Sequence, residues 1–131
     1  MNGVSLFRFL LCCFLVISAD LLFVGCIMRR PYARMIESIQ NSPVALRRLP
    51  ALLASLSVCV GLWGISLVDA DGWNQTNQRN ATIFGFASFL IYNATNLSVF
   101  TNWSARNAVL DTLYGTMLCT VTYLIVVTLI H

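Results

Sequence analysis

The sequence predicts an all-α polytopic membrane protein: a bundle of four transmembrane helices, with a short amphipathic surface helix between the first and the second. Two observations support this fold class. Hydrophobic residues make up 58% of the chain and charged residues only 10%, whereas a soluble domain carries about 25% charged residues. Four long apolar runs also follow one another, and at about 20 residues per span the 131 residues have room for four spans and short loops. We treat residues 1–131 as a single membrane domain.

The first predicted span covers residues 4–28 and is interrupted by two charged residues, Arg8 and Asp20. A cleaved signal peptide is the main alternative, because an arginine precedes a hydrophobic stretch. The run is long for a signal peptide, and an aspartate is unusual beside a cleavage site. We therefore expect a retained helix.

Residues 29–48 form a basic connection that has the pattern of an amphipathic helix. Pro31 suits a helix start, and apolar residues recur at i, i+3, i+4 and i+7 on one face: Tyr32, Met35, Ile36 and Ile39. The pattern predicts a helix on the membrane surface that ends near Asn41. An ordinary loop with a helical turn is an equal alternative. The arginines of this connection are candidate contacts with the membrane surface or a partner: Arg29, Arg30, Arg34, Arg47 and Arg48.

The remaining spans are predicted at residues 49–68, 83–100 and 108–130. Gly61 and Gly64 in the second span, and Gly115 in the fourth, are small enough to let neighbouring helices approach closely. Residues 69–80 read as a polar loop. The link between the last two spans is short, so these helices are predicted to be antiparallel neighbours.

The positions of the arginines predict the topology. Five lie in the first connection and Arg106 lies in the third, whereas only Arg8 and Arg79 fall on the opposite side. The positive-inside rule then places the arginine-rich loop on the cytoplasmic or equivalent face and both termini across the membrane.

Polar residues inside the apolar runs predict a layer in the inner half of the bilayer. Asp20 lies seven residues before the inner end of its span, or roughly 10 Å deep at 1.5 Å per residue. Groups on the third and fourth spans fall at similar or shallower depth. The predicted layer consists of Asp20, Asn93, Thr95, Asn96, Asp111 and Thr116. Such residues either join helices through hydrogen bonds or form a site for protons, ions or a small polar ligand.

Several classes of function find no support in the sequence. No Ser-His-Asp set, metal motif or phosphate-binding loop is present, so we predict no catalytic residue, no metal and no cofactor. The five cysteines form no CxxC pair and lie in apolar segments. The arginines gather beside a predicted membrane boundary, which favours lipid contact over nucleic-acid binding.

The polar segments resemble a family of predicted membrane proteins known as domain of unknown function 2177. The family pattern joins a Tyr-Asp-x-Thr-Asn segment, a Trp and an Asp-x-x-Trp-Gly-Thr segment, and an Asp-Leu-Leu-Trp-x-Gly motif is similar to residues 20–25. Asn93 replaces an aspartate of the pattern, and Phe23 and Tyr114 replace tryptophans. The spacing is otherwise kept at Tyr92, Thr95, Asn96, Trp103, Asp111, Gly115 and Thr116.

The resemblance implies a four-span fold but no activity, because the family has no agreed function. Its members occur in bacteria and in some large DNA viruses. The use of arginine without lysine, together with five Asn-x-Ser/Thr triplets, makes a viral or eukaryotic source worth considering.

The function that these features favour is non-enzymatic. We expect an integral membrane protein with a structural or partner-binding role, as the membrane anchor of a larger assembly such as a virion or as a homo-oligomer. The alternative is a small proton-coupled transporter or channel that uses the intramembrane Asp/Asn layer.

Overall fold

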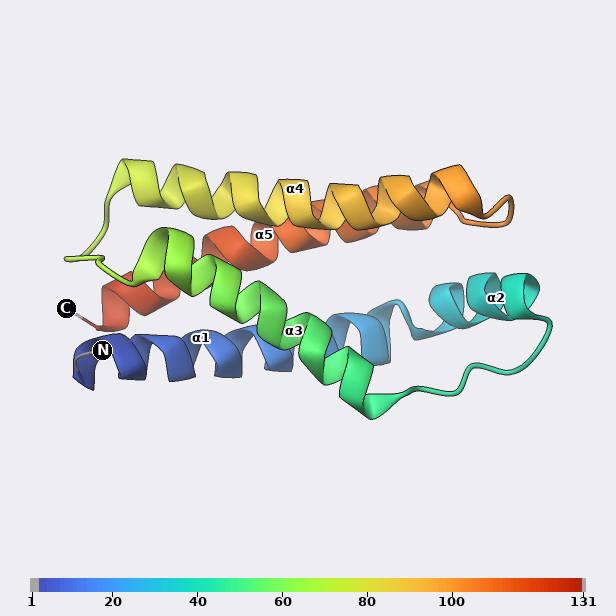
Figure 1. Cartoon of the computed structure of the whole chain (residues 1–131), viewed down its shortest axis with the longest axis horizontal. Helices are drawn as coiled ribbons and strands as arrows, with labels where there is room; N and C mark the ends of the chain where they lie inside the picture. The colour runs from blue at the N-terminus through green and yellow to red at the C-terminus, as the bar shows by residue number, and fades with distance from the viewer. Residues whose placement is uncertain (1–2, 131) are drawn as a thin grey trace.

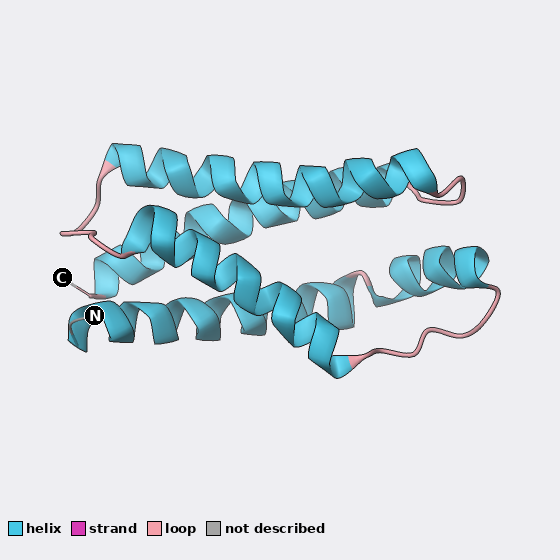
Figure 2. Ribbon diagram, viewed as in Figure 1, coloured by secondary structure: helices cyan, strands magenta, loops and turns pink. Residues whose placement is uncertain are grey.

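The computed structural model describes residues 3–130, and every regular element in that range is a helix. Figure 1 shows the long helices side by side along one axis, and both described ends of the chain lie at the same end of the bundle. Figure 2 shows that the loops are short, apart from the connection between α2 and α3. The prediction of an all-α fold is therefore confirmed.

The first span is formed by α1 (Gly3–Leu22), which continues into a π-helical turn, η1 (Phe23–Ile27). The turn is recognisable from its hydrogen bond, in which the amide of Met28 donates to the carbonyl of Phe23, five residues back, at 2.7 Å. The chain then bends at Met28. Beyond the bend it starts a separate helix.

The predicted helix between the first two spans is α2 (Arg29–Gln40). It ends where Asn41 takes a left-handed conformation, with a φ of 54°, and donates its amide to Glu37. The structure differs from the expectation in what the apolar face contacts. Met35 is buried against the protein, with its sulfur within 3.2 Å of the amide of Ser104. The apolar face of α2 therefore packs partly on the bundle rather than on lipid.

The second span is formed by α3 (Arg48–Leu62) and a second π-helical turn, η2 (Trp63–Leu67). The next helix, α4 (Gln75–Val99), begins eight residues before the predicted span at residue 83. Hydropathy alone predicts a loop for the polar first turns of this helix. They are helical because the Asn74 side chain caps the helix, accepting hydrogen bonds from the amides of Thr76 and Asn77.

The last helix, α5 (Ala105–Leu129), returns antiparallel to α4, as the short link between them predicts (Figure 1). The two helices approach most closely where two glycines meet. A Cβ atom on Gly85 would lie 2.5 Å from the carbonyl oxygen of Gly115 and 2.9 Å from the Cβ of Cys119. This contact places α5 inside the molecule, where it carries the longest set of buried side chains.

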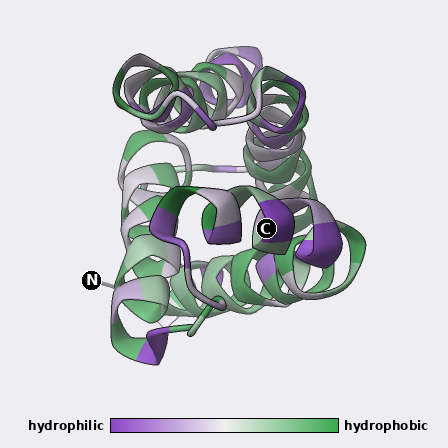
Figure 3. Ribbon diagram, turned by 90° about the vertical axis from the view of Figure 1, so that its right-hand side faces the viewer, coloured by the Kyte–Doolittle hydropathy of each residue, from purple (hydrophilic) through white to green (hydrophobic). Residues whose placement is uncertain are grey.

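Three helical segments are long and apolar enough to cross a membrane: Gly3–Ile27, Arg48–Leu67 and Ala105–Leu129. At 25 residues, α4 is long enough but more polar, so a fourth span stays a prediction. The part of α4 that follows the polar start does expose large apolar side chains, among them Ile83, Ile91 and Val99. Figure 3, which views the bundle end-on, shows that hydrophobic and hydrophilic residues both occur along the helices.

Candidate functional site

The polar residues predicted to form one layer are organised around two carboxylates. The first is Asp20, near the end of α1, which accepts a hydrogen bond on each oxygen. Ser55 of α3 donates its hydroxyl to Oδ2 at 2.8 Å, and Tyr114 of α5 donates its phenol to Oδ1, also at 2.8 Å. Asp20 thereby joins α1 to both α3 and α5.

The second carboxylate, Asp111, is buried and lies near the start of α5. Tyr32 of α2 donates its phenol to Oδ1 at 2.7 Å, and Asn93 of α4 donates its amide to Oδ2 at 2.7 Å. Asn93 is almost completely buried and also donates to the carbonyl of Phe89 at 3.0 Å. Asp111 thereby joins α5 to both α2 and α4.

Tyr114, which donates to Asp20, lies three residues beyond Asp111 on the same helix, α5. Its ring stacks on Phe23 of η1, with ring centroids 3.8 Å apart and an angle of 3° between the planes. Phe23 and Tyr114 are the two positions where the sequence departs from the tryptophans of the family pattern. The two departures therefore lie in direct contact.

All four donors to the carboxylates are neutral hydroxyl or amide groups. Arg29, Arg30 and Arg106, the arginines closest to this depth in the predicted topology, have exposed side chains. At Tyr32, which lies outside the spans, burial raises the pKa of the phenol, and its hydrogen bond to Asp111 raises the pKa further. Tyr32 therefore stays a neutral donor at physiological pH.

Three other members of the predicted layer lie outside these two centres. Thr95 is exposed and lies two residues after Asn93 on α4, so it faces away from α5. Asn96 is half-buried and lies beside Tyr92 rather than beside a carboxylate. Thr116 donates to the carbonyl of Thr112 on its own helix at 2.8 Å, as threonines in apolar helices often do.

The three glycines predicted to promote helix packing have different surroundings. An added Cβ on Gly61 would meet the ring of Phe84, and one on Gly115 would meet the ring of Phe89. An added Cβ on Gly64 would meet nothing within 4 Å, because this residue lies on the outer side of η2. Gly85, which the sequence reasoning did not single out, makes the closest backbone approach.

The five arginines of the first connection are all exposed, three of them on α2 and two at the junction of the linker with α3: Arg29, Arg30, Arg34, Arg47 and Arg48. None of them donates to Asp20 or Asp111, whose oxygens bond to the neutral groups above. The five arginines are therefore not part of the polar layer, although Tyr32 of the same segment bonds to it.

Sequence reasoning missed three residues that complete the centres. Ser55 carried no distinguishing pattern in the second span, and Tyr32 was interpreted as part of a lipid-facing surface. Tyr114 carried a recognisable signal, because it lies three residues from Asp111 and so shares its side of α5. The pairing of Tyr32 with Asp111 had no local signal, since 79 residues separate them.

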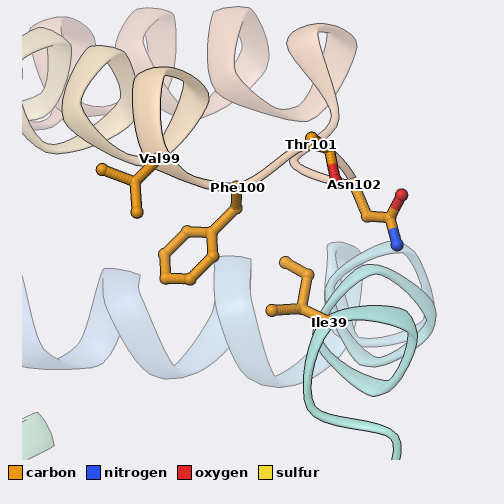
Figure 4. A pocket seen from close by; sticks show the side chains of 5 residues that line it. All are labelled: Ile39, Val99, Phe100, Thr101 and Asn102. Carbon is orange, nitrogen blue, oxygen red and sulfur yellow. The ribbon is translucent and has the colours of Figure 1, made fainter.

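Two small cavities border the bundle, and neither is lined by a carboxylate. One, of about 180 Å³, lies between Ile39 of α2 and the α4–α5 turn, where Phe100 and Asn102 face it (Figure 4). The other, of about 280 Å³, is an apolar groove between α1 and α5 beside Tyr114 and Met117. Among the residues that the structure describes, no group of three or more potential metal ligands comes together.

Comparison with known proteins adds one finding. A family model described as "Predicted membrane protein (DUF2177)" matches residues 5–128, which is nearly the whole chain. No curated protein and no solved structure matches the chain significantly.

Proposed function

We propose that this chain, which belongs to the DUF2177 family of predicted membrane proteins, is a non-enzymatic integral membrane protein that holds a partner at the membrane through the outer face of α2. The observation that carries this proposal is the exposure of Arg29, Arg30 and Arg34 on a helix whose other face is occupied.

The outer face of α2 is available because the inner face is docked on the bundle. Tyr32 bonds to Asp111, and Asn102 of the α4–α5 turn donates to the carbonyl of Ser38 at 3.2 Å. Arg30, Arg34 and Glu37 follow one another at i, i+4 and i+7, so they share the opposite face, and all three are exposed. An acidic partner surface would complement this mainly basic face.

The polar layer supports a structural reading of the rest of the molecule. Both oxygens of each carboxylate are bonded to other helices of the same chain, as expected when polar groups join helices in an apolar surrounding. Each such bond is worth about 1 kcal/mol in a membrane. The bundle would then act as a rigid mount for α2 within a larger assembly, such as a virion shell or a homo-oligomer.

The proposal is tested by cross-linking in the native membrane, extraction in mild detergent and mass analysis of the extracted species. We expect a stoichiometric partner with the parent chain and its loss in the double variant Arg30→Gln/Arg34→Gln. Arg79→Gln, which changes an exposed arginine at the start of α4, is the matched control. A lone protomer from the parent chain, or an equal yield of partner from all three proteins, would contradict the proposal.

Proton-coupled transport is the second candidate, and the specific observation in its favour is that Tyr114, three residues beyond Asp111 on α5, donates its phenol to Asp20. Ionisable residues inside membrane helices often mark routes for protons or ions. In this reading, Asp20 and Asp111 are the groups that exchange protons, and the hydroxyls of Tyr114 and Tyr32 orient them.

Transport is tested with the full chain reconstituted into vesicles that contain a pH-sensitive dye. The candidate predicts a proton flux that Asp111→Asn abolishes while the helical content and unfolding temperature stay close to those of the parent. The control is Asp71→Asn, an exposed aspartate in the loop before α4. No flux in the parent, or the same flux in Asp111→Asn, would exclude this candidate.

A further inference from the structure

The connection between α2 and α3 carries an exposed set of apolar and basic side chains that no part of the bundle covers. Residues 41–47 have no regular structure, and Figure 1 shows them as an extended arm along the outside of the molecule. Gln40 fixes the start of the arm through bonds from its amide to the carbonyls of Ser42 and Pro43, both at 3.0 Å. Every residue from Gln40 to Leu53 is exposed.

Three large apolar residues of this arm and of the first turn of α3 are exposed. Val44 is 42% exposed, Leu46 76% and Leu49 68%, and they alternate with alanine and arginine rather than with acidic or amide residues. Arg47 and Arg48 lie between the two leucines and are also exposed. A short segment in which large apolar residues flank adjacent arginines is suited to the boundary between acyl chains and phosphates.

The position of the arm in the fold agrees with such a boundary. Arg48 is the first residue of a candidate membrane span, and the preceding span ends at Ile27, on the same side of the bundle. The apolar face of α2 cannot shield the arm, because Met35 is already buried against Ser104, at the start of α5. The arm, rather than α2, therefore presents the free apolar side chains at this membrane boundary.

We propose that the segment Val44–Leu49 lies in the headgroup layer of the membrane and binds anionic phospholipid. The side chains of Val44, Leu46 and Leu49 enter the upper acyl region, and Arg47 and Arg48 contact lipid phosphates. Charge complementarity selects anionic over zwitterionic lipid, because no carboxylate within residues 3–130 pairs with these two adjacent arginines. This surface is separate from the outer face of α2, so the inference does not rest on the proposed partner binding.

The first test measures which lipid stays with the purified full chain in mixed micelles of phosphatidylcholine and phosphatidylglycerol. We expect the parent to retain phosphatidylglycerol preferentially. The double variant Arg47→Gln/Arg48→Gln should lose this preference by about fivefold for each arginine removed. Arg79→Gln, on the opposite side of the bundle, should keep the preference of the parent. No preference in the parent, or an unchanged preference in the double variant, would overturn the inference.

The second test measures the depth of the arm. A tryptophan introduced by Leu46→Trp should be quenched by phospholipids brominated near the headgroup, beyond the quenching of the three native tryptophans. Leu49→Trp serves the same purpose if the first variant loses helical content. An indole that only aqueous quenchers reach would show that the arm lies in water, and the inference would fail. It would also fail if the double variant kept its lipid preference but lost a cross-linked protein.

Discussion

Asp111 and Asn93 form a buried polar contact between α4 and α5. Because Asn93 supplies an amide donor, the contact forms without an additional proton on the Asp111 carboxylate. The Asn93 amide donates both to Asp111 and to the carbonyl of Phe89. An aspartate at this position, as in the family pattern, would place two carboxyl groups at hydrogen-bonding distance. One of them would have to hold a proton.

Asn93→Asp should therefore make stability depend on pH. The bond to Phe89 is lost at any pH, and the carboxyl pair stays bonded only while it holds a proton. We expect the unfolding temperature in detergent to fall as the pH rises from about 5 to about 8, with a cost of about 1–3 kcal/mol at the upper end. Asn96→Asp, the same change beside Tyr92, is the control. Parallel pH profiles for the two variants would contradict this account.

Tyr32 makes a second prediction, at alkaline pH. Its pKa is raised by burial and by Asp111, and the nearby Tyr92 and Tyr114 act in the same direction. A raised pKa means that the phenol stabilises the fold fully below its unfolded pKa of about 10, and that this contribution is lost as the pH rises further. Tyr32→Phe should lower stability by about 1 kcal/mol at neutral pH. Above a pH of about 10, the stability of the variant should fall less than that of the parent.

The readout for Tyr32→Phe is thermal unfolding across pH, together with hydrogen exchange of the α2 amides at neutral pH. Loss of the bond to Asp111 should speed exchange in α2 more than in α4. Identical alkaline profiles for parent and variant would show that the Tyr32 contact does not contribute to stability.

Sequence reasoning at the residue scale identified both acceptors, Asp20 and Asp111, and one of their four donors, Asn93. Asp20, Asp111 and Asn93 are conspicuous because they are polar in apolar runs. Ser55 and Tyr114 are ordinary in such runs, and Tyr32 is ordinary in an amphipathic helix, so their part in the site follows only from which helices meet. Thr95 fell outside the site because the relative rotation of α4 against α5 decides which polar residues face the interface.

At the scale of the helices, the α4–α5 contact depends on the absence of side chains at glycine positions. Gly115→Ala should lower stability by about 1–3 kcal/mol, because the new methyl group would meet the ring of Phe89 and force the helices apart. Gly64→Ala is the matched control, since its methyl group would meet nothing. The measurement is the unfolding temperature of each variant in the same detergent. Equal effects would mean that the close approach does not limit packing.

The sequence predicted the helix boundaries well where the apolar run and the helix cover the same residues. The prediction was wrong where the helix extends into polar residues. The apolar segments of α1, α3 and α5 begin and end within a few residues of the predicted spans. The first turns of α4 are polar, so hydropathy excluded them, although the cap at Asn74 starts the helix there. The docking of α2 was also out of reach, because an amphipathic pattern does not distinguish lipid from a protein surface.

At the scale of the whole molecule, the topology remains a prediction that can be measured directly. The two described ends lie at one end of the bundle, and α2 and the α4–α5 turn lie at the other (Figure 1). An epitope at the N-terminus should react in intact cells, whereas one inserted between Asn41 and Ser42 should react only after permeabilisation. The opposite pattern would show that the arginine-rich side faces outward.

The two π-helical turns have a consequence for relatives of this chain. In both η1 and η2 an amide bonds five residues back, from Met28 to Phe23 at 2.7 Å and from Val68 to Trp63 at 2.8 Å. A π-helical turn contains one residue more than an α-helical turn at the same position would contain. Removing one residue there restores α-helical geometry without rotating the flanking faces. We therefore expect homologous sequences to differ by single-residue gaps at 23–27 and 63–67, and deletions elsewhere in the spans to be rare.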